Sequence, residues 1–381
     1  IEMKTIEMKT RENGLDYLRI IAACGVVLVH VVAYFILTVM NSGDMFTLAT
    51  LIKYRNLSSF AVPAFVMISG AFIFLSEGTK DFKKFYKKTF HKLVIPTIVF
   101  TIIYIITHFI EIALVIENSD FSFGIIIDGL PETLTRAFRG EASEHLWYMF
   151  MLIVLYIFAP FVMRIKDGLS EKGFRNVAII LLIWGVLGNL AYVIFHEGDP
   201  NANTKVYWSL DNVINFLGLF MSGYVVHEFA KKIRKKVGKK ITANIIALIC
   251  IIVGFLICYS KYSLFLSYPG KVFVMDFTPL HPFFVVAAIF LVFGFSLLDI
   301  KCGLTKMSAA TYWVYLVHPA VFIFYRLVVS KIKGIGYSTF ANQDLWPTFW
   351  MMFAVCTVIS FIVGIIIDTC IGAVHKKKSC A

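Results

Sequence analysis

Apolar residues along the chain are grouped into ten blocks, each about as long as a helix that crosses a membrane. Such a helix needs about 20 mostly apolar residues, because the hydrocarbon core of a bilayer is about 30 Å thick. The second block is short, and we expect it to begin nearer Leu51. The pattern predicts an all-α membrane protein, a polytopic bundle of about ten transmembrane helices. The blocks are Leu15–Met40, Phe60–Leu75, Leu93–Ile116, His145–Met163, Val177–Phe195, Val213–Phe229, Ile241–Tyr259, His281–Leu298, Tyr312–Val329 and Trp346–Ile371.

Composition supports this class and argues against a soluble protein. Of the 381 residues, 59% are hydrophobic and 16% are charged, whereas about a quarter of residues are charged in an average soluble domain. The first block is too long for a cleaved signal peptide and lacks a small-residue cleavage site. We expect residues 1–14, where "IEMKT" occurs twice, to be an added or disordered cytoplasmic tail. Residues 15–371 then form one transmembrane domain, and 372–381 a basic cytoplasmic tail.

Charge predicts the orientation in the membrane. The chain has 36 Lys and Arg against 24 Asp and Glu, a net charge of +12. If the N-terminus is cytoplasmic, most basic residues fall in cytoplasmic segments, including the run "KKIRKKVGKK" at 231–240. The positive-inside rule therefore favours ten spans with both termini in the cytoplasm, and the longest outer loop is expected at 117–144. This use of basic loops leaves no reason to expect nucleic acid as a partner.

The cysteines indicate neither disulfides nor a metal site. All seven lie in expected helices or on the cytoplasmic side, where disulfides are rare. No pair has a metal-ligand spacing, so no metal is expected. Cys24 and His30 are six residues apart, about 240° around a helix, and do not form a nucleophile and base.

Two polar residues interrupt the first block, "LDYLRIIAACGVVLVHVVAYF". Arg19 and His30 are eleven residues apart, which places them within about 20° on one helical face and roughly 16 Å apart along the axis. Arg19 would lie near the cytoplasmic surface and His30 near the middle of the membrane. Intramembrane ionisable residues are costly and usually functional, so the pair suits a reaction whose anionic reagent arrives from the cytoplasm. Alternatively, Arg19 extends to the surface and His30 bonds a neighbouring helix.

Five segments in order along the chain resemble the acyltransferase 3 family of bacterial membrane acyltransferases. The first is the Arg19 to His30 spacing preceded by "GLD". "FYKKTFHKLVIPTIVF" resembles the basic stretch before a Pro-containing third span, although Lys88, His91 and Lys92 stand where many members carry arginines. Lysine lacks the planar guanidinium fork but still attracts anions. The other three are "VPAFVMISGAFIF" (62–74), "HLWYMFMLIVLYIFAP" (145–160) and "ATYWVYLVHPAV" (310–321).

The resemblance implies transfer of an acyl group, commonly acetyl, from cytoplasmic acyl-CoA to a hydroxyl of an extracytoplasmic or membrane-linked glycan. Arg19, Lys88 and Lys92 would hold the phosphates of the acyl-CoA co-substrate, with Ser69 beside them. Alternatively, the two lysines only set the orientation of the chain in the membrane, and Ser69-Gly70 only allows close packing of helices. His30 would act as general base or carry the acyl group. Asp16, three residues before Arg19, could orient its guanidinium.

Candidates for acceptor binding lie in the outer halves of several spans. The aromatic residues could pack on a sugar ring or form an interface belt. His318 precedes Pro319, so it could also satisfy a backbone carbonyl that the proline leaves without a donor. The candidates are Glu144, His145, Trp147, Tyr148, His108, Glu111 and His318.

A rival interpretation is transport. Some relatives form the membrane part of vancomycin-resistance serine racemases, where this architecture is associated with serine supply. A permease for a small solute would also explain polar residues within the spans, whereas a purely structural scaffold would not. The enzyme is favoured by the Arg19 and His30 pair and by the basic cytoplasmic segment. Either protein would be a multi-pass protein of the bacterial cytoplasmic membrane. The sequence leaves open a homo-oligomer and a fused or associated soluble domain.

Overall fold

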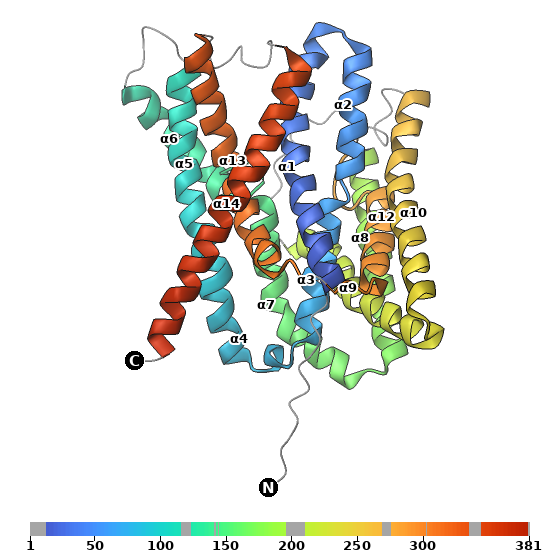
Figure 1. The fold of residues 1–381 in the computed structure, drawn as a ribbon. Coiled ribbons are helices and arrows are strands. Elements are labelled where there is room, and N and C mark those ends of the chain that lie inside the picture. The colour runs from blue at the N-terminus through green and yellow to red at the C-terminus, as the bar shows by residue number, and fades with distance from the viewer. Residues whose placement is uncertain are drawn as a thin grey trace.

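The described part of the chain consists of helices joined by short turns and contains no strand. The computed structural model describes residues 13–115, 123–140, 142–143, 145–195, 210–268, 276–301, 303–334 and 344–379. Figure 1 shows the helices as one bundle. They are α1 (Asn13–Ser42), α2 (Met45–Ser58), α3 (Ala61–Leu75), η1 (Glu77–Lys80), α4 (Phe82–Thr89), η2 (Phe90–Val94), α5 (Ile95–Val115), α6 (Phe123–Arg139), α7 (Trp147–Gly168), α8 (Glu171–Phe195), α9 (Leu210–Val237), α10 (Lys240–Ser267), α12 (Pro282–Leu297), α13 (Thr305–Lys333) and α14 (Leu345–Ser379).

The predicted polytopic bundle is confirmed. Among the described residues, nine helices are long and apolar enough to cross a membrane. The second expected span begins well before Phe60, because α2 and α3 together form an apolar stretch over Met45–Leu75. The eighth expected span is α12, which is apolar but has only 16 residues. At 1.5 Å per residue, α12 is about 24 Å long, shorter than the hydrocarbon core.

The loop expected at 117–144 contains a helix that was not predicted. This helix, α6, has a polar face and an exposed apolar face that carries Ile127, Leu130, Leu134 and Phe138. Spacings of three and four residues place these side chains on one side of the helix. The segment also contains acidic residues among these apolar positions, as well as Pro131, and both features are typical of a loop.

The basic segments gather at one end of the bundle. Figure 1 shows α4, the junction of α7 and α8 and the turn between α9 and α10 at this end. The first turn of α1 and the last turn of α14 point towards the same end, and the turn between α1 and α2 lies at the opposite end. The arrangement agrees with the charge pattern. Assigning the basic end to the cytoplasm stays a prediction.

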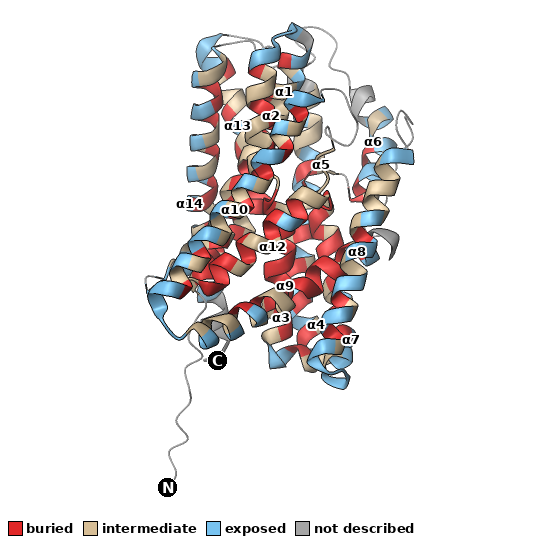
Figure 2. Ribbon diagram, turned by 90° about the vertical axis from the view of Figure 1, so that its right-hand side faces the viewer, coloured by how far each residue is buried: buried red, intermediate tan, exposed pale blue. Residues whose placement is uncertain are grey.

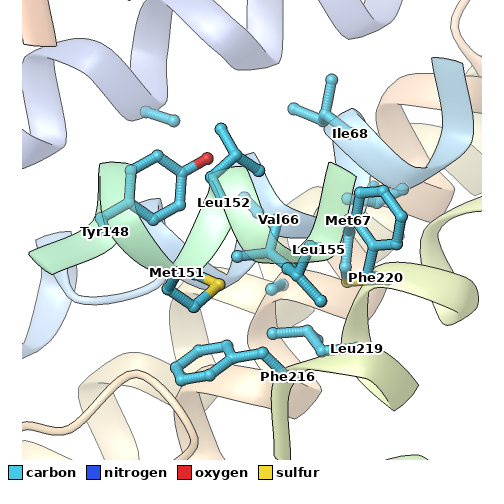
Figure 3. Close-up of a cluster of buried hydrophobic side chains, with 14 of the residues drawn as sticks. Val66, Met67, Ile68, Tyr148, Met151, Leu152, Leu155, Phe216, Leu219 and Phe220 are labelled. Atoms are coloured by element: carbon cyan, nitrogen blue, oxygen red, sulfur yellow. The ribbon is translucent and has the colours of Figure 1, made fainter. Parts of the chain in front are cut away.

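A close helix crossing holds the centre of the bundle. A Cβ on Gly70 of α3 would lie 1.8 Å from the carbonyl oxygen of Phe220 in α9, and one on Gly223 would lie 1.8 Å from that of Met67. Small residues allow such contact between membrane helices. Figure 3 shows side chains from α3, α7 and α9 filling the adjoining core, and Figure 2 shows exposed residues on the outer faces of α10 and α14. The close crossing agrees with the helix-packing role that the sequence left open for Gly70.

Candidate functional site

A cavity of about 460 Å³ lies among seven helical segments of the bundle: α1, α3, η1, α4, η2, α7 and α13. Because its lining includes Ser76, which precedes η1, and Gly78 within η1, the cavity reaches the basic end of the molecule. Most of the remaining lining is apolar or aromatic, as in a pocket for a small ligand. Its polar side chains include Arg19 from α1, Ser69 from α3, Lys84 and Lys88 from α4, Lys92 from η2, Tyr148 and Tyr156 from α7, and Ser308, Tyr312 and Tyr315 from α13.

Three lysines line the cavity near the basic end. Lys84, Lys88 and Lys92 follow one another at intervals of four residues, so they share one side of the helix. The helix contains a π-helical turn at Phe90–Val94, in which the Ile95 N–H donates to the Phe90 carbonyl. The three side chains are exposed, and none forms an ion pair with a described residue. They are therefore available to an anion that enters the cavity.

Arg19 forms another cationic part of the wall. Its guanidinium carbon lies 4.5 Å from the centre of the Phe72 ring, a cation–π distance. Asp16 is buried and accepts a hydrogen bond of 2.5 Å from the Ser308 hydroxyl, which also lines the cavity. That Asp16 orients Arg19 stays a prediction; the contact shown joins α1 to α13.

Beside the cavity mouth, an ion-pair cluster connects η1 to α7. The Lys80 ammonium lies 2.9 Å from Glu77 and 3.0 Å from Asp167. Hydrogen bonds to these carboxylates, first Glu77 and then Asp167, raise the pKa of Lys80 above its ordinary value. The two carboxylates therefore favour the charged form of Lys80.

Three histidine rings from distant parts of the chain meet in the interior. His30 belongs to α1, His318 to α13, and His145 comes just before α7. The His30 ring centre lies 5.1 Å from that of His318 and 6.2 Å from that of His145. The His145 and His318 rings are 5.2 Å apart, and both residues are almost completely buried. We call these three residues the histidine cluster.

The hydrogen bonds of His318 define how its ring is protonated. Its Nδ1 lies 3.1 Å from the carbonyl oxygen of Val314 and 2.9 Å from that of Tyr315. Both carbonyls are acceptors, so Nδ1 must carry the proton. Pro319 has no N–H to offer Tyr315, which explains one of these bonds. His318 therefore donates to backbone carbonyls of its own helix. Its Nε2 carries no proton and remains a hydrogen-bond acceptor.

Two nitrogens of the histidine cluster have no hydrogen-bond partner among the described residues. They are Nε2 of His145 and Nε2 of His318, and both are buried. The other nitrogen of His145 lies 3.0 Å from the Ser143 hydroxyl. Buried polar atoms are almost always hydrogen-bonded, so two unpartnered ring nitrogens this close together indicate a place for a polar ligand.

Tyrosines connect the cavity to the histidine cluster. The Tyr315 ring centre lies 5.5 Å from His145 and 6.0 Å from His318, and Tyr315 also lines the cavity. Its hydroxyl donates to the His145 carbonyl. Tyr148 lies 5.1 Å from Tyr315, and Figure 3 shows its hydroxyl above the α7 ribbon. The cavity wall and the histidine cluster are therefore contiguous.

The structure separates the sequence-predicted residues into two groups. The cavity collects Arg19, Ser69, Lys88, Lys92 and Tyr148, and the histidine cluster collects the three histidines. His145 and Tyr148 are 1% and 4% exposed, so neither belongs to an exposed interface belt.

The remaining predicted residues lie elsewhere or outside the described residues. Trp147 packs against Tyr148 and against Phe216 of α9, at ring distances of 6.2 and 5.9 Å. Glu111 lies 3.6 Å from Arg326 of α13, and His108 is partly buried beside Phe109. Trp147, Glu111 and His108 do not line the cavity described above. Glu144 lies outside the described residues.

Several residues of the site were not predicted from the sequence. Tyr315 is three residues before His318, so the helical period could have placed both on one face. Lys84 continues the four-residue interval of Lys88 and Lys92. Tyr312 also lines the cavity with a buried hydroxyl that has no hydrogen-bond partner in the described structure. Over the described residues, no His, Cys, Asp or Glu group is arranged to hold a metal ion.

Comparison with known proteins identifies a family for this chain. A family model described as an acyltransferase domain, Acyl_transf_3, matches residues 12–368. No curated protein and no solved structure matches the chain. The matched range runs from the start of α1 to Asp368 in α14 and contains the whole cavity and the histidine cluster. This chain is therefore a member of the acyltransferase 3 family of membrane acyltransferases.

Proposed function

We propose that this acyltransferase moves an acyl group, in the simplest case acetyl, from cytoplasmic acyl-CoA to a hydroxyl of an extracytoplasmic or membrane-linked glycan. One observation carries the proposal: the cationic cavity at the basic end adjoins the buried histidine cluster through Tyr315. The reaction needs a place that binds the anionic donor and, next to it, a group that can take a proton. The cationic cavity suits the first requirement, and the histidine cluster suits the second.

The cavity suits the two ends of acyl-CoA. The nucleotide end carries several phosphate charges, and four cationic side chains face them: Arg19, Lys84, Lys88 and Lys92. Hydrogen bonds between charged partners are stronger than neutral ones, and the guanidinium can bind phosphate through two parallel bonds. The narrow, mostly uncharged pantetheine arm fits the aromatic part of the lining. The thioester would then lie towards Tyr148 and Tyr315, next to the histidines.

His30 is the proposed general base. Its imidazole takes the proton of the acceptor hydroxyl while that oxygen attacks the thioester carbonyl carbon. The carbon–sulfur bond breaks, and the thiolate leaves with the proton from the imidazolium, so the products are an ester and free CoA. Nε2 of His318 and of His145 would accept hydrogen bonds from the acceptor and hold it beside His30. An acyl-imidazole on His30 is the alternative route to the same products.

Labelled acetyl-CoA tests the proposed function. Purified protein would be incubated with it in the presence and absence of a cell-envelope glycan extract, with His30→Gln as the matched control. The proposal predicts label in the glycan fraction and release of CoA, both absent from the control. Folded protein that neither binds nor consumes acetyl-CoA, while another acyl donor supports transfer, would contradict the choice of donor.

A further inference from the structure

A second hollow, separate from the cavity described above, lies at the turn between α9 and α10. It has a volume of about 490 Å³, and all its charged lining residues are basic. Gly238 makes the turn in the left-handed region at φ 67°. No residue is shared with the first cavity, and Figure 1 shows this turn well apart from α4. The lining residues are Lys231, Arg234, Lys235, Gly238, Lys239, Lys240 and Ala243.

Positive charge in this hollow exceeds the negative charge around it. Arg234 and Lys240 share one carboxylate, that of Asp299, at 3.1 and 2.6 Å. Lys231 pairs with Glu228 at 3.4 Å. Lys235 and Lys239 form no ion pair within the described part of the chain, so their charges remain available for a bound anion.

An exposed apolar stripe begins at the hollow and continues along α10. Its members follow at intervals of three and four residues, which places them on one face. Ile241, the first, is 76% exposed and adjoins Lys240. Exposed apolar side chains on a membrane-spanning helix contact lipid tails. A ligand that fits both features therefore has an anionic head and apolar chains. The stripe consists of Ile241, Ile245, Leu248, Ile252 and Leu256.

We propose that this hollow binds the phosphate headgroup of an anionic phospholipid. Lys235 and Lys239 are the main ligands of the headgroup, and the α10 stripe contacts the acyl chains of the lipid. Clusters of Lys and Arg at the cytoplasmic ends of membrane helices attract anionic headgroups. A free phosphate would gain nothing from the apolar stripe, so the lipid is the favoured source of the anion. The site is independent of the proposed acyl transfer.

The test compares lipids and variants by thermal unfolding of purified protein in detergent. Wild type would be titrated with phosphatidylglycerol, phosphatidylcholine and glycerol 1-phosphate. The variant Lys235→Gln/Lys239→Gln removes the two charges. Lys172→Gln/Lys301→Gln is the matched control, because it removes two exposed lysines at the same end that line neither cavity. Lys235→Arg/Lys239→Arg keeps the charges.

Phosphatidylglycerol should raise the unfolding temperature of wild type, of the control and of the arginine variant, and phosphatidylcholine should not. A surface lysine contributes roughly a fivefold change in affinity for anionic lipid, so the double Gln variant should bind roughly 25-fold more weakly. Equal binding by the double Gln variant and the control would overturn the site. Equal stabilisation by glycerol 1-phosphate and phosphatidylglycerol would overturn the assignment to a lipid.

Discussion

At the residue scale, His318 and His145 each use one ring nitrogen for the fold and offer the other to the site. The Nδ1 of His318 bonds two carbonyls of its own helix, and that of His145 lies beside the Ser143 hydroxyl. These contacts fix the rings, and for His318 they also fix the tautomer. A ring held in this way presents its Nε2 in one direction, which is what a binding or catalytic position requires.

Substitution of His318 by Asn separates its two roles. The Asn amide can replace Nδ1–H as donor to the backbone carbonyls, but it has no atom at the place of Nε2. We expect His318→Asn to unfold at nearly the wild-type temperature while acyl transfer falls by about 2- to 13-fold, because the lost hydrogen bond to the acceptor contributes about 0.5–1.5 kcal/mol. His318→Ala should lose both activity and stability. Full activity in His318→Asn would leave the histidine with its helix-satisfying role alone.

Arg19 is predicted to carry more of the donor affinity than the neighbouring lysines. Loss of a charged hydrogen bond costs about 1.5–3 kcal/mol, so Arg19→Ala should weaken acyl-CoA binding by about 10- to 150-fold. Lys92→Ala should have a smaller effect, because it is exposed and Lys84 and Lys88 remain beside it. Isothermal titration with CoA measures both. If folded Arg19→Ala binds CoA with unchanged affinity, Arg19 only extends its side chain to the membrane surface and does not bind the donor.

Single-helix spacing predicted part of the site, and contacts between helices supplied the rest. Arg19 and His30 share α1, so their common face follows from the helical period alone. His145 was expected among outer-side aromatics, but it is buried and its ring lies 5.2 Å from that of His318. No pattern in the sequence gives the distance between a residue of α1 and one of α13.

At the element scale, the crossing of α3 and α9 depends on two glycines, Gly70 and Gly223. A methyl group at Gly70 would overlap a backbone oxygen of α9, and backbone cannot move aside as a flexible side chain can. The helices must then separate, which disturbs the core shown in Figure 3. Because Ser69 precedes Gly70, this crossing also positions one wall of the cavity.

Gly70→Ala should therefore be destabilising, by about 1–3 kcal/mol or more, as expected for overpacking. Gly372→Ala is the matched control, because Gly372 lies in α14 with no atom near its added methyl. Alanine is preferred to glycine within helices by about 1 kcal/mol, so the control should be neutral or stabilised. Thermal unfolding in detergent compares them. Equal unfolding temperatures for the two variants would show that α3 and α9 are not so closely packed.

Most helices were predictable because a membrane demands long apolar runs. The two departures have physical reasons. Helix α12 is shorter than the bilayer core, and the amphipathic α6 has charged residues between its apolar positions, so a search for apolar runs passes over it. Packing against neighbours, and not hydrophobicity alone, determines where such elements begin and end.

At the scale of the whole molecule, the basic segments and α6 lie at opposite ends of the bundle (Figure 1). The positive-inside rule predicts that the basic end is cytoplasmic. Single cysteines at Lys235 and Glu132 should therefore react with a membrane-impermeant thiol reagent from opposite sides of sealed vesicles. Labelling of both from one side would contradict the predicted topology.

Donor binding and proton transfer are proposed to occur at separate, adjoining places. His30→Gln tests it most directly, because Gln keeps a hydrogen bond but cannot accept the proton. Acyl transfer from labelled acetyl-CoA and CoA affinity would be measured on the same preparations. We predict that transfer falls by about 10²–10⁴-fold, the usual contribution of a general base, while CoA affinity is unchanged. Transfer near the wild-type rate in His30→Gln would contradict the account.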